Sequence, residues 1–450
     1  MNAAESQPLQ RLAQADALHL PGGRFTLGLP DAIRQTTADG TRDSICWIPD
    51  SICWRRPLYA VVSSRIGRHL HRRHDWFALL RQAIAATRQD AATLLISDGT
   101  AAAPWIQRAA DRFACPAITI CVSPENEDFD RWIGRIQKHP PTDRIAISPP
   151  IAPSTAIADA PRRDAVTIFL ADRVYAPLVS SGGNIDRLLE RRLSDRRWNP
   201  ASVWIAIDPK NRTAQSHIER GAVGWMLAPR HARVSSDPPE DAPTNHVTLD
   251  ELLSQRGESD DADHWPYLVH CTRERDGAWP DQSEADFHDD LLSGDCTCES
   301  GPLATLRRIL QTGRLLATDR LTRDGQPVVC LSARPLSDLL GSRVFRSHLG
   351  RWDYEPYGIA IHRSLLETQG SRPAIYGDAD DFAALAPADQ AFFQDRGTTH
   401  DWRLEKEWRI AADIDLTTIA SHEAFVFVRS VRDLPPIARY CRWPIVVVGV

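Results

Sequence analysis

The chain has 450 residues, of which 42% are hydrophobic and 25% are charged, and its formal net charge is −6. This composition is typical of a soluble globular protein and argues against a fibrous or largely disordered chain. The length predicts two or three domains. The acidic balance provides no overall attraction to nucleic acid, although arginines cluster locally.

The first residues, the apolar runs and the cysteines of the sequence indicate the cellular compartment in which we expect the protein. The first residues are polar and lack the apolar core of a signal peptide. The longest apolar runs, such as residues 444–450, are too short to span a bilayer. Nine cysteines are scattered along the chain, and neither the pair Cys46 and Cys53 nor the pair Cys296 and Cys298 has the spacing of a convincing zinc site. We expect a cytoplasmic protein with reduced thiols, no metal and no membrane partner, with metal binding by a cysteine pair as the alternative.

Residues 57–230 alternate between two kinds of pattern. Short apolar runs rich in β-branched residues predict strands at residues 58–64, 93–97, 117–123, 165–171 and 202–207. Stretches with apolar side chains at helical spacing separate them, at residues 76–89, 105–113 and 184–193. This alternation predicts an α/β domain with a doubly wound parallel sheet.

The other parts of the chain differ in composition. Residues 1–56 form an N-terminal extension, and residues 231–264 are rich in Pro, Ser and Asp, which predicts a linker with one short helix at residues 248–253. Residues 265–450 predict a strand-rich α+β domain. Its expected strands lie at residues 267–272, 327–333, 357–362, 372–377, 405–411, 424–429 and 444–450. Its expected helices lie at residues 300–315, capped by Ser300 and ended by Gly313, and at residues 383–395.

Three turns of small residues follow predicted strands in the first domain, at residues 63–65, 97–100 and 180–184. Parallel sheets bind ligands at the carboxyl ends of their strands. Small residues let backbone N–H groups approach an anion, and a following helix adds partial positive charge. Each turn could equally be an ordinary turn. The candidate phosphate contacts are Ser64, Arg65, Gly99, Thr100, Gly182, Gly183 and Asn184.

In their order, these turns resemble the nucleotide-binding domain of the superfamily that contains DNA-processing protein A and lysine-decarboxylase-like proteins, often called SLOG. Residues 63–65 match a Gly-Ser-Arg-like turn, residues 97–100 a Ser-Gly-Gly-Ala-like turn, and residues 181–183 a Ser-Gly turn that opens a helix. Ser63 and Asp98 depart from the family's glycines. The resemblance spans roughly residues 57–207. It implies binding of a nucleotide or nucleotide-derived small molecule, and in some members single-stranded DNA.

The second domain contains the octapeptide RLEKEWRI at residues 403–410. If this segment is a strand, Glu405, Glu407 and Arg409 project to one face. Two neighbouring carboxylates repel each other unless an arginine balances them, and such crowding suits acid–base or charge-stabilising chemistry. The alternative is an exposed strand with salt bridges.

The motif order of this domain resembles the ADP-ribosyltransferase-like fold. It comprises an early His270-x-Thr272, a helix with Leu-x-x-Ile-Leu-x-x-Gly-x-Leu at residues 306–315, Ser332 at a strand end and the late Glu-x-Glu. The family's Ser-Thr-Ser is replaced by residues 331–333, Leu-Ser-Ala. Together with residues 355–366, the same segments resemble, more closely, bacterial proteins of unknown function associated with abortive phage infection.

The transferase resemblance implies NAD as a substrate. Glu407 would stabilise the oxocarbenium-like transition state of ribosyl–nicotinamide cleavage, and Glu405 would activate an acceptor, which is a protein or a nucleic acid. His270 would face the same hollow as Glu407. The remaining expected contacts are Thr272 with His270 at the adenosine ribose, Ser332 at the nicotinamide pocket, Arg273 at a pyrophosphate and Tyr357 stacked on an aromatic ring.

Three functions remain open at this point. The first is a bacterial antiphage protein in which a nucleotide-sensing domain controls an NAD-consuming ADP-ribosyltransferase or NAD glycohydrolase. The second is a nucleotide-binding or signalling protein without catalysis. The third is a nucleic-acid-processing enzyme such as a nuclease, although no two-metal cluster of carboxylates stands out.

Overall fold

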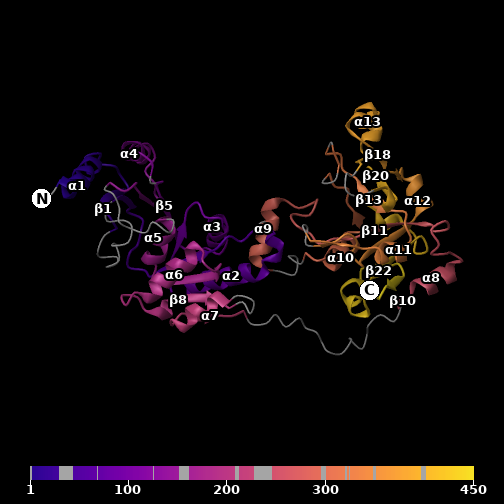
Figure 1. The fold of residues 1–450 in the computed structure, drawn as a ribbon, viewed down its shortest axis with the longest axis horizontal. Helices are drawn as coiled ribbons and strands as arrows, with labels where there is room; N and C mark the ends of the chain where they lie inside the picture. Colours follow the sequence, from indigo (N-terminus) through magenta and orange to yellow (C-terminus); the bar gives the residue numbers. More distant parts are fainter. Residues whose placement is uncertain are drawn as a thin grey trace. The chain divides into compact units, whose positions relative to one another are not determined.

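The computed structural model describes residues 3–29, 44–67, 69–124, 126–151, 162–207, 212–227, 246–294, 300–319, 322–323, 325–347, 351–396 and 402–449. The chain divides into two compact units (Figure 1). The first consists of Met1–Arg230 with Asp289–Asp295, and the second of His231–His288 with Cys296–Val450. Cys296 and Cys298 lie outside the described residues, as do residues 231–245 of the expected linker.

A nine-stranded sheet forms the centre of the first unit, in the order β1-β2-β6-β5-β4-β3-β7-β8-β9. The strands are β1 (Gly23–Leu27), β2 (Ile45–Pro49), β3 (Leu58–Ser63), β4 (Thr93–Ser97), β5 (Ala117–Val122), β6 (Arg144–Ile147), β7 (Arg173–Leu178), β8 (Val203–Ala206) and β9 (Val223–Trp225). Pairing from β6 through β9 is parallel. The chain builds outward from β3 to β6 on one side and from β7 to β9 on the other, so the direction of winding reverses between β3 and β7.

Helices cover both faces of this sheet, as the alternating pattern predicted (Figure 1). They are α1 (Ala3–Asp16), α2 (His74–Gln89), α3 (Ala103–Arg112), α4 (Phe129–Lys138), α5 (Arg162–Leu170), α6 (Asn184–Ser194) and α7 (Arg212–Glu219). Helices α5 and α6 share one hydrophobic core with Ala60 and Val62 of β3. Helices α2 and α3 contact each other and the sheet, and they contribute no residue to that core.

Two predictions for the first unit are corrected. Residues 165–171, predicted as a strand, lie mostly in α5, and the strand comes later as β7. A short apolar run does not distinguish a strand from a helix that is buried on most sides, and α5 is such a helix. Residues 1–56 are more than an extension, because β2 pairs antiparallel with β6 and β1 pairs with β2.

The second unit is built on an eight-stranded, mostly antiparallel sheet, in the order β10-β23-β22-β16-β11-β13-β20-β17. These strands are β10 (His246–Val247), β11 (Tyr267–Cys271), β13 (Val329–Ser332), β16 (Gly358–His362), β17 (Arg372–Pro373), β20 (Glu407–Ile410), β22 (Ala424–Val428) and β23 (Ile445–Val447). Short two-stranded pairs join β12 (Arg314–Leu315) to β21 (Ile414–Asp415), β14 (Phe345–Arg346) to β15 (Arg351–Trp352), and β18 (Ile375–Gly377) to β19 (Phe393–Asp395).

Each face of this sheet has its own core. The described helices of this part of the chain are α8 (Leu249–Arg256), α9 (Glu284–Ser293), α10 (Pro302–Thr312), α11 (Leu336–Gly341), α12 (Arg363–Thr368), α13 (Ala379–Ala384), α14 (Pro387–Gln390) and α15 (Pro435–Ala438). Helices α10 and α15 pack on the face that carries Leu268, Leu331 and Ile410. Helices α8 and α11 pack on the opposite face, with Val269 and Phe427.

The structure also revises three local predictions in this unit. Helix α10 begins after Gly301, and no side chain caps it, so Ser300 does not serve as its cap. Residues 383–395 form no single helix: they contain the end of α13, the short helix α14 and the strand β19. The strand at residues 405–411 begins at Glu407, because residues 402–405 form a 3₁₀ turn.

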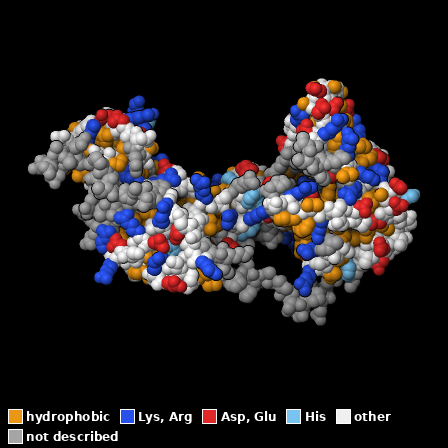
Figure 2. Space-filling model, viewed as in Figure 1, with side chains coloured by type: hydrophobic (Ala, Val, Ile, Leu, Met, Phe, Trp, Pro, Cys, Tyr) orange, Lys and Arg blue, Asp and Glu red, His pale blue; other side chains and the backbone are white. Residues whose placement is uncertain are grey.

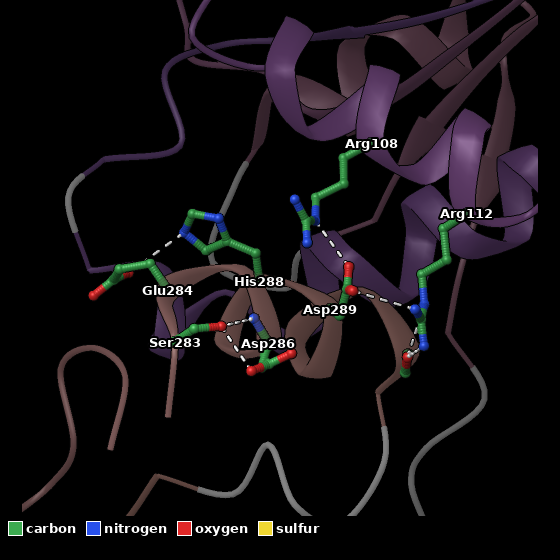
Figure 3. Close-up of polar contacts among 8 residues, drawn as sticks. Arg108, Arg112, Ser283, Glu284, Asp286, His288 and Asp289 are labelled. Carbon is green, nitrogen blue, oxygen red and sulfur yellow. Dashed lines mark hydrogen bonds and ion pairs between the residues drawn. The ribbon is translucent and has the colours of Figure 1, made fainter. Parts of the chain in front are cut away.

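Helix α9 is divided between the two units, since Glu284–His288 group with the second and Asp289–Ser293 with the first. Asp289 forms ion pairs of 2.8 Å with Arg108 and 3.3 Å with Arg112, both on α3, and Figure 3 shows these three side chains converging. Arg81 of α2 donates hydrogen bonds to the carbonyl oxygens of Leu291 and Leu292. A cation at these terminal carbonyls stabilises the end of a helix.

Candidate functional site

The loops after β3 and β7 meet at the point where the winding of the first sheet reverses. The Ser64 amide donates to the carbonyl oxygen of Leu178 at 2.8 Å, and the Ser64 hydroxyl accepts from the Ser180 amide at 2.9 Å. On the other side of this loop, the Ser63 hydroxyl accepts from the Trp76 indole of α2 at 3.0 Å. The two predicted turns at residues 63–65 and 180–184 are therefore brought together, at the edge where doubly wound sheets bind ligands.

The turn after β4 is closed by its own side chains. Gly99 has a φ of +69°, which favours glycine, and its amide donates to Oδ1 of Asp98 at 2.9 Å. The Thr100 hydroxyl donates to the carbonyl of Ser97 at 3.1 Å and accepts from the Ala103 amide at 3.1 Å, which joins the turn to α3. Thr100 is therefore occupied in holding the turn.

The turn before α6 is also satisfied internally. Gly182 has a φ of +70°, and its amide donates to Oδ2 of Asp186 at 2.7 Å. The other carboxylate oxygen of Asp186 lies 2.7 Å from Nε2 of the buried His217. The Gly183 amide donates to the Ser180 carbonyl at 3.1 Å. Asn184 accepts from Arg187 at 2.8 Å.

The Gly99 and Gly182 amides, which were expected to face a phosphate, thus already bind carboxylates of the same chain. An anionic ligand at this edge would therefore depend mainly on side-chain cations rather than on a nest of free amides. Arg65 is exposed immediately after β3, and its side chain has no ion pair or hydrogen bond within the described residues. Figure 2 shows that basic and acidic side chains are interspersed over the visible face of both units.

A second cation at this edge, Arg163, was missed by the sequence prediction. A Cβ atom placed on Gly99 would lie 2.9 Å from an Nη atom of Arg163, so the guanidinium covers this turn. The next residue, Asp164, is buried, and its carboxylate accepts from the Ser97 hydroxyl at 3.2 Å. Burial raises the pKa of Asp164, and Arg163 and Ser97 oppose that shift. The misassignment of residues 165–171 as a strand concealed that Arg163 and Asp164 begin a helix.

In the second unit, the three strands that carry the expected catalytic residues are neighbours. β13 lies between β11 and β20, and the register pairs Val269 with Ser332 and Ser332 with Glu407. Side chains of directly paired residues share a face. Ser332 and Glu407 therefore lie together, on the face whose core includes Val269.

His270 projects to the other face of the same sheet. It pairs with Ile359, which belongs to the core beneath α10, and its neighbours Val269 and Cys271 face the opposite way. The expectation that His270 and Glu407 face one hollow is therefore wrong. The Nδ1 atom of His270 lies 2.9 Å from the Cys330 carbonyl oxygen. Burial lowers the pKa of His270, the hydrogen bond to Cys330 opposes that shift and Arg273 reinforces it.

Glu407 is the counter-ion of a buried arginine. Nε of Arg409 lies 2.9 Å from Oε1 of Glu407, and the Arg409 side chain is fully buried. The guanidinium also donates to the carbonyl oxygens of Ala391 and Phe393. The Glu407 carboxylate further raises the pKa of the neighbouring Cys330 thiol, which burial brings to about 12.

Glu405 approaches this cluster from a turn rather than from the strand. Lys406 has a φ of +44°, an uncommon conformation for a residue with a side chain. The turn directs the Glu405 carbonyl to the Ser332 hydroxyl, which donates to it at 2.6 Å, and the Lys406 carbonyl to the Ala333 amide at 3.0 Å. The Ser332 hydroxyl thus anchors the turn that separates the two glutamates.

The remaining expected NAD contacts lie near the end of β11. Thr272 is buried, and its hydroxyl lies 2.9 Å from the Pro302 carbonyl and 3.1 Å from the Tyr357 carbonyl, so it ties β11 to α10 and β16. The Tyr357 hydroxyl lies 3.4 Å from Asp433, and burial, reinforced by Asp433, raises the pKa of Tyr357 to about 12. Arg273 is half-buried and close enough to Cys271 to oppose the rise in the pKa of that thiol.

Tyr354, like Tyr357, is an aromatic side chain that could stack on a ligand ring, and the structure gives it a specific position. Its hydroxyl is buried and has no hydrogen-bond partner within the described residues. Burial raises the pKa of Tyr354, as do Glu405 and Cys271, while Arg334 and Arg273 lower it. Tyr354 therefore lies among the charged groups at the end of β11 and beside the Glu405 turn.

None of the described helices is long and apolar enough to cross a membrane. In the same part of the chain, no three or more His, Cys, Asp or Glu side chains are grouped so that they could hold a metal ion.

Comparison with solved structures finds weak likenesses to DNA processing protein A. The protein from Streptococcus pneumoniae matches with a TM-score of 0.31 and 12% identity, over 47% of this chain and 74% of that chain. The protein from Helicobacter pylori, whose single-stranded DNA binding mode is described, matches with a TM-score of 0.28 and 15% identity, over 46% of this chain and 92% of that chain. These TM-scores are low, and we base no conclusion on them. No family model and no curated protein matches the chain.

Proposed function

We propose that the first unit binds a nucleotide or a nucleotide-derived small molecule at the carboxyl edge of its sheet. The observation that carries this proposal is the hydrogen-bonded junction of the β3 and β7 loops, at Ser64 and Ser180, where the winding reverses. In doubly wound folds, the crevice at this point accommodates the ligand, because the flanking connections leave on opposite faces of the sheet.

The charges at this edge favour a ligand with a phosphate. Arg65 and Arg163 supply guanidinium groups, which bind phosphate oxygens through paired hydrogen bonds. Asp98 and Asp186 already occupy the Gly99 and Gly182 amides. The phosphate would therefore lie against the arginines, and the nucleoside against the loop junction.

Calorimetric titration of the full chain with ADP and with NAD tests this binding. Arg65→Ala should weaken the affinity about tenfold or more, the usual effect of losing a charge-assisted hydrogen bond. Arg56→Ala is the matched control, because Arg56 is an exposed arginine that precedes β3 at the other end of the strand. Equal affinity of both variants, or no binding to the wild-type chain, would overturn the proposal.

We also propose that the second unit is an NAD-cleaving effector, which the nucleotide bound by the first unit controls, in a bacterial antiphage protein of the abortive-infection type. The specific support is the placement of the Glu407 carboxylate beside Ser332, with the Glu405 turn anchored on that same serine. Because His270 belongs to the other face, the adenosine ribose would have to be held by other groups, such as Tyr354 and Arg273.

Release of nicotinamide from NAD, measured by mass spectrometry with and without ADP, tests the effector role. Glu405→Gln and Glu407→Gln should each abolish release, and Glu367→Gln, at an exposed glutamate of α12, should retain it. Thermal unfolding of each variant separates lost chemistry from lost folding. If the wild-type chain binds nucleotide but releases no nicotinamide under any condition, the protein is a binding protein without turnover.

A further inference from the structure

The ribbon of β14 and β15 carries large apolar side chains that the rest of the unit leaves exposed. Phe345 is 50% exposed, Val344 is 50% exposed and Trp352 is 37% exposed. Phe345 and Trp352 are paired across the ribbon, and their ring centroids are 5.5 Å apart at an interplanar angle of 68°. The ribbon continues through a hydrogen bond of 3.1 Å from the Asp353 amide to the Val344 carbonyl.

The aromatic pair is accompanied by arginines. The guanidinium carbon of Arg343 lies 4.9 Å from the centroid of the Trp352 ring. At the base of the ribbon, Arg334 donates to the Asp338 carbonyl at 3.2 Å and to the Ser342 hydroxyl at 3.0 Å. Within the described residues, neither Arg343 nor Arg334 has a carboxylate at ion-pair distance. Arg346 does, because its Nε lies 2.7 Å from Asp353.

If the aromatic pair served only to stabilise the ribbon, we would expect other residues to bury it, because exposed aromatic area does not contribute to the stability of the core. Here Phe345 is 50% exposed and Trp352 is 37% exposed in an otherwise acidic protein. Within the described residues, Glu355 interacts electrostatically with Arg343 but is not at ion-pair distance. An apolar protein partner would have to desolvate these guanidinium groups. A polyanion with flat apolar rings matches both features at once, since its phosphates meet the arginines and its bases stack on the aromatic side chains.

We propose that this ribbon, defined by Arg343, Val344, Phe345 and Trp352 with Arg334 at its base, binds single-stranded nucleic acid. Bases stack on Phe345 and on the Trp352–Arg343 pair, and Arg334 contacts the backbone. The inference is independent of nucleotide binding by the first unit, because it concerns different residues and a different class of ligand.

Fluorescence anisotropy of the full chain with a fluorescein-labelled single-stranded DNA of about 20 nucleotides tests the ribbon. Trp352→Ala and Phe345→Ala should each weaken the affinity about five- to 150-fold, the range for the loss of one base–aromatic stack. Arg334→Ala, which removes the proposed backbone contact, should lower the slope of log affinity against log salt by about 0.7. Met226→Ala, at a 66% exposed apolar residue of the first unit, is the matched control and should change nothing.

The results of these measurements either support or overturn the ribbon as a nucleic-acid site. Weaker binding by both aromatic variants, with unchanged ADP titration, supports the ribbon as the nucleic-acid site. Three results overturn it: no oligonucleotide binding by the wild-type chain at low salt, equal binding by Trp352→Ala, or equal competition by a duplex of the same sequence. Self-association of the wild-type chain that disappears in Trp352→Ala, without oligonucleotide binding, would instead assign the ribbon to a protein contact.

Discussion

At the scale of residues, Glu407 has two roles to reconcile. It is the expected catalytic carboxylate, and it is also the counter-ion of the fully buried Arg409. A buried guanidinium without its carboxylate is strongly destabilising, because the protein interior does not replace the lost hydration of the charge. A loss of activity on substitution of Glu407 would therefore not by itself identify a catalytic group.

Glu407→Gln should lower the free energy of unfolding by about 3–5 kcal/mol, the usual result of breaking a buried ion pair from one side. Urea denaturation measures this loss. The exposed Glu367→Gln should change stability by no more than about 0.5 kcal/mol. Unchanged stability of Glu407→Gln would show that Arg409 does not depend on this carboxylate, and would make any loss of activity directly interpretable.

The half-buried His270 provides a pH dependence with a definite sign. Its pKa in the folded chain is lowered, chiefly by burial, so the unfolded chain binds the proton more readily. The contribution of His270 to the free energy of unfolding is therefore complete above its pKa in the unfolded chain, about 6.5. This contribution is lost as the pH falls through the lower pKa that His270 has in the folded chain. The slope from this one group is at most about 1.4 kcal/mol per pH unit.

His270→Gln, which retains a hydrogen-bond donor, should show a flatter fall in stability below this pH than the wild-type chain does. Chemical denaturation at a series of pH values measures the difference between the two proteins, in which the contributions of other groups cancel. Parallel curves for the two proteins would contradict the assignment.

At the scale of elements, strand register decides what the second unit presents on each face. Successive side chains of a strand point to opposite faces of the sheet. Whether His270 and Glu407 share a face can therefore be decided only when the pairing register of their strands is known, and that register depends on residues far apart in the chain. The strands themselves were largely recognisable from short apolar runs such as those of β11, β16 and β22. The turn at Lys406 was not recognisable, because nothing local indicates a left-handed lysine within a β-rich octapeptide.

A substitution at Gly358 tests how closely β16 packs against its neighbours β11 and β22. A Cβ atom at this position would lie 2.1 Å from the His270 carbonyl oxygen and 2.5 Å from the Phe427 ring. Gly358→Ala should therefore destabilise the second unit by about 1–3 kcal/mol or more, because the backbone of β11 has to move. Gly341→Ala is the matched control, since a Cβ there has open space at the end of α11. Calorimetry of both variants measures the effect, and equal stabilities would contradict the close packing.

At the scale of the whole molecule, the chain forms two compact units, and the first recruits residues 289–295 from the sequence of the second. Two separate cores predict two thermal transitions in calorimetry. ADP at about 100 times its dissociation constant should stabilise the first unit by about 2.7 kcal/mol and leave the other transition in place. A single transition that shifts as a whole would show that the two units unfold cooperatively.

The local chemistry of the sequence was sufficient for the fold class, for most strands and for the three small-residue turns. Hydrophobic period and turn-forming residues act over a few positions, so they can be read without contacts. Tertiary structure alone decided the pairing of β2 with β6, the helical state of residues 165–171, the occupation of the Gly99 and Gly182 amides by Asp98 and Asp186, and the opposite faces of His270 and Glu407. Each of these depends on the free energy of contacts between residues distant in the chain, which no local pattern encodes.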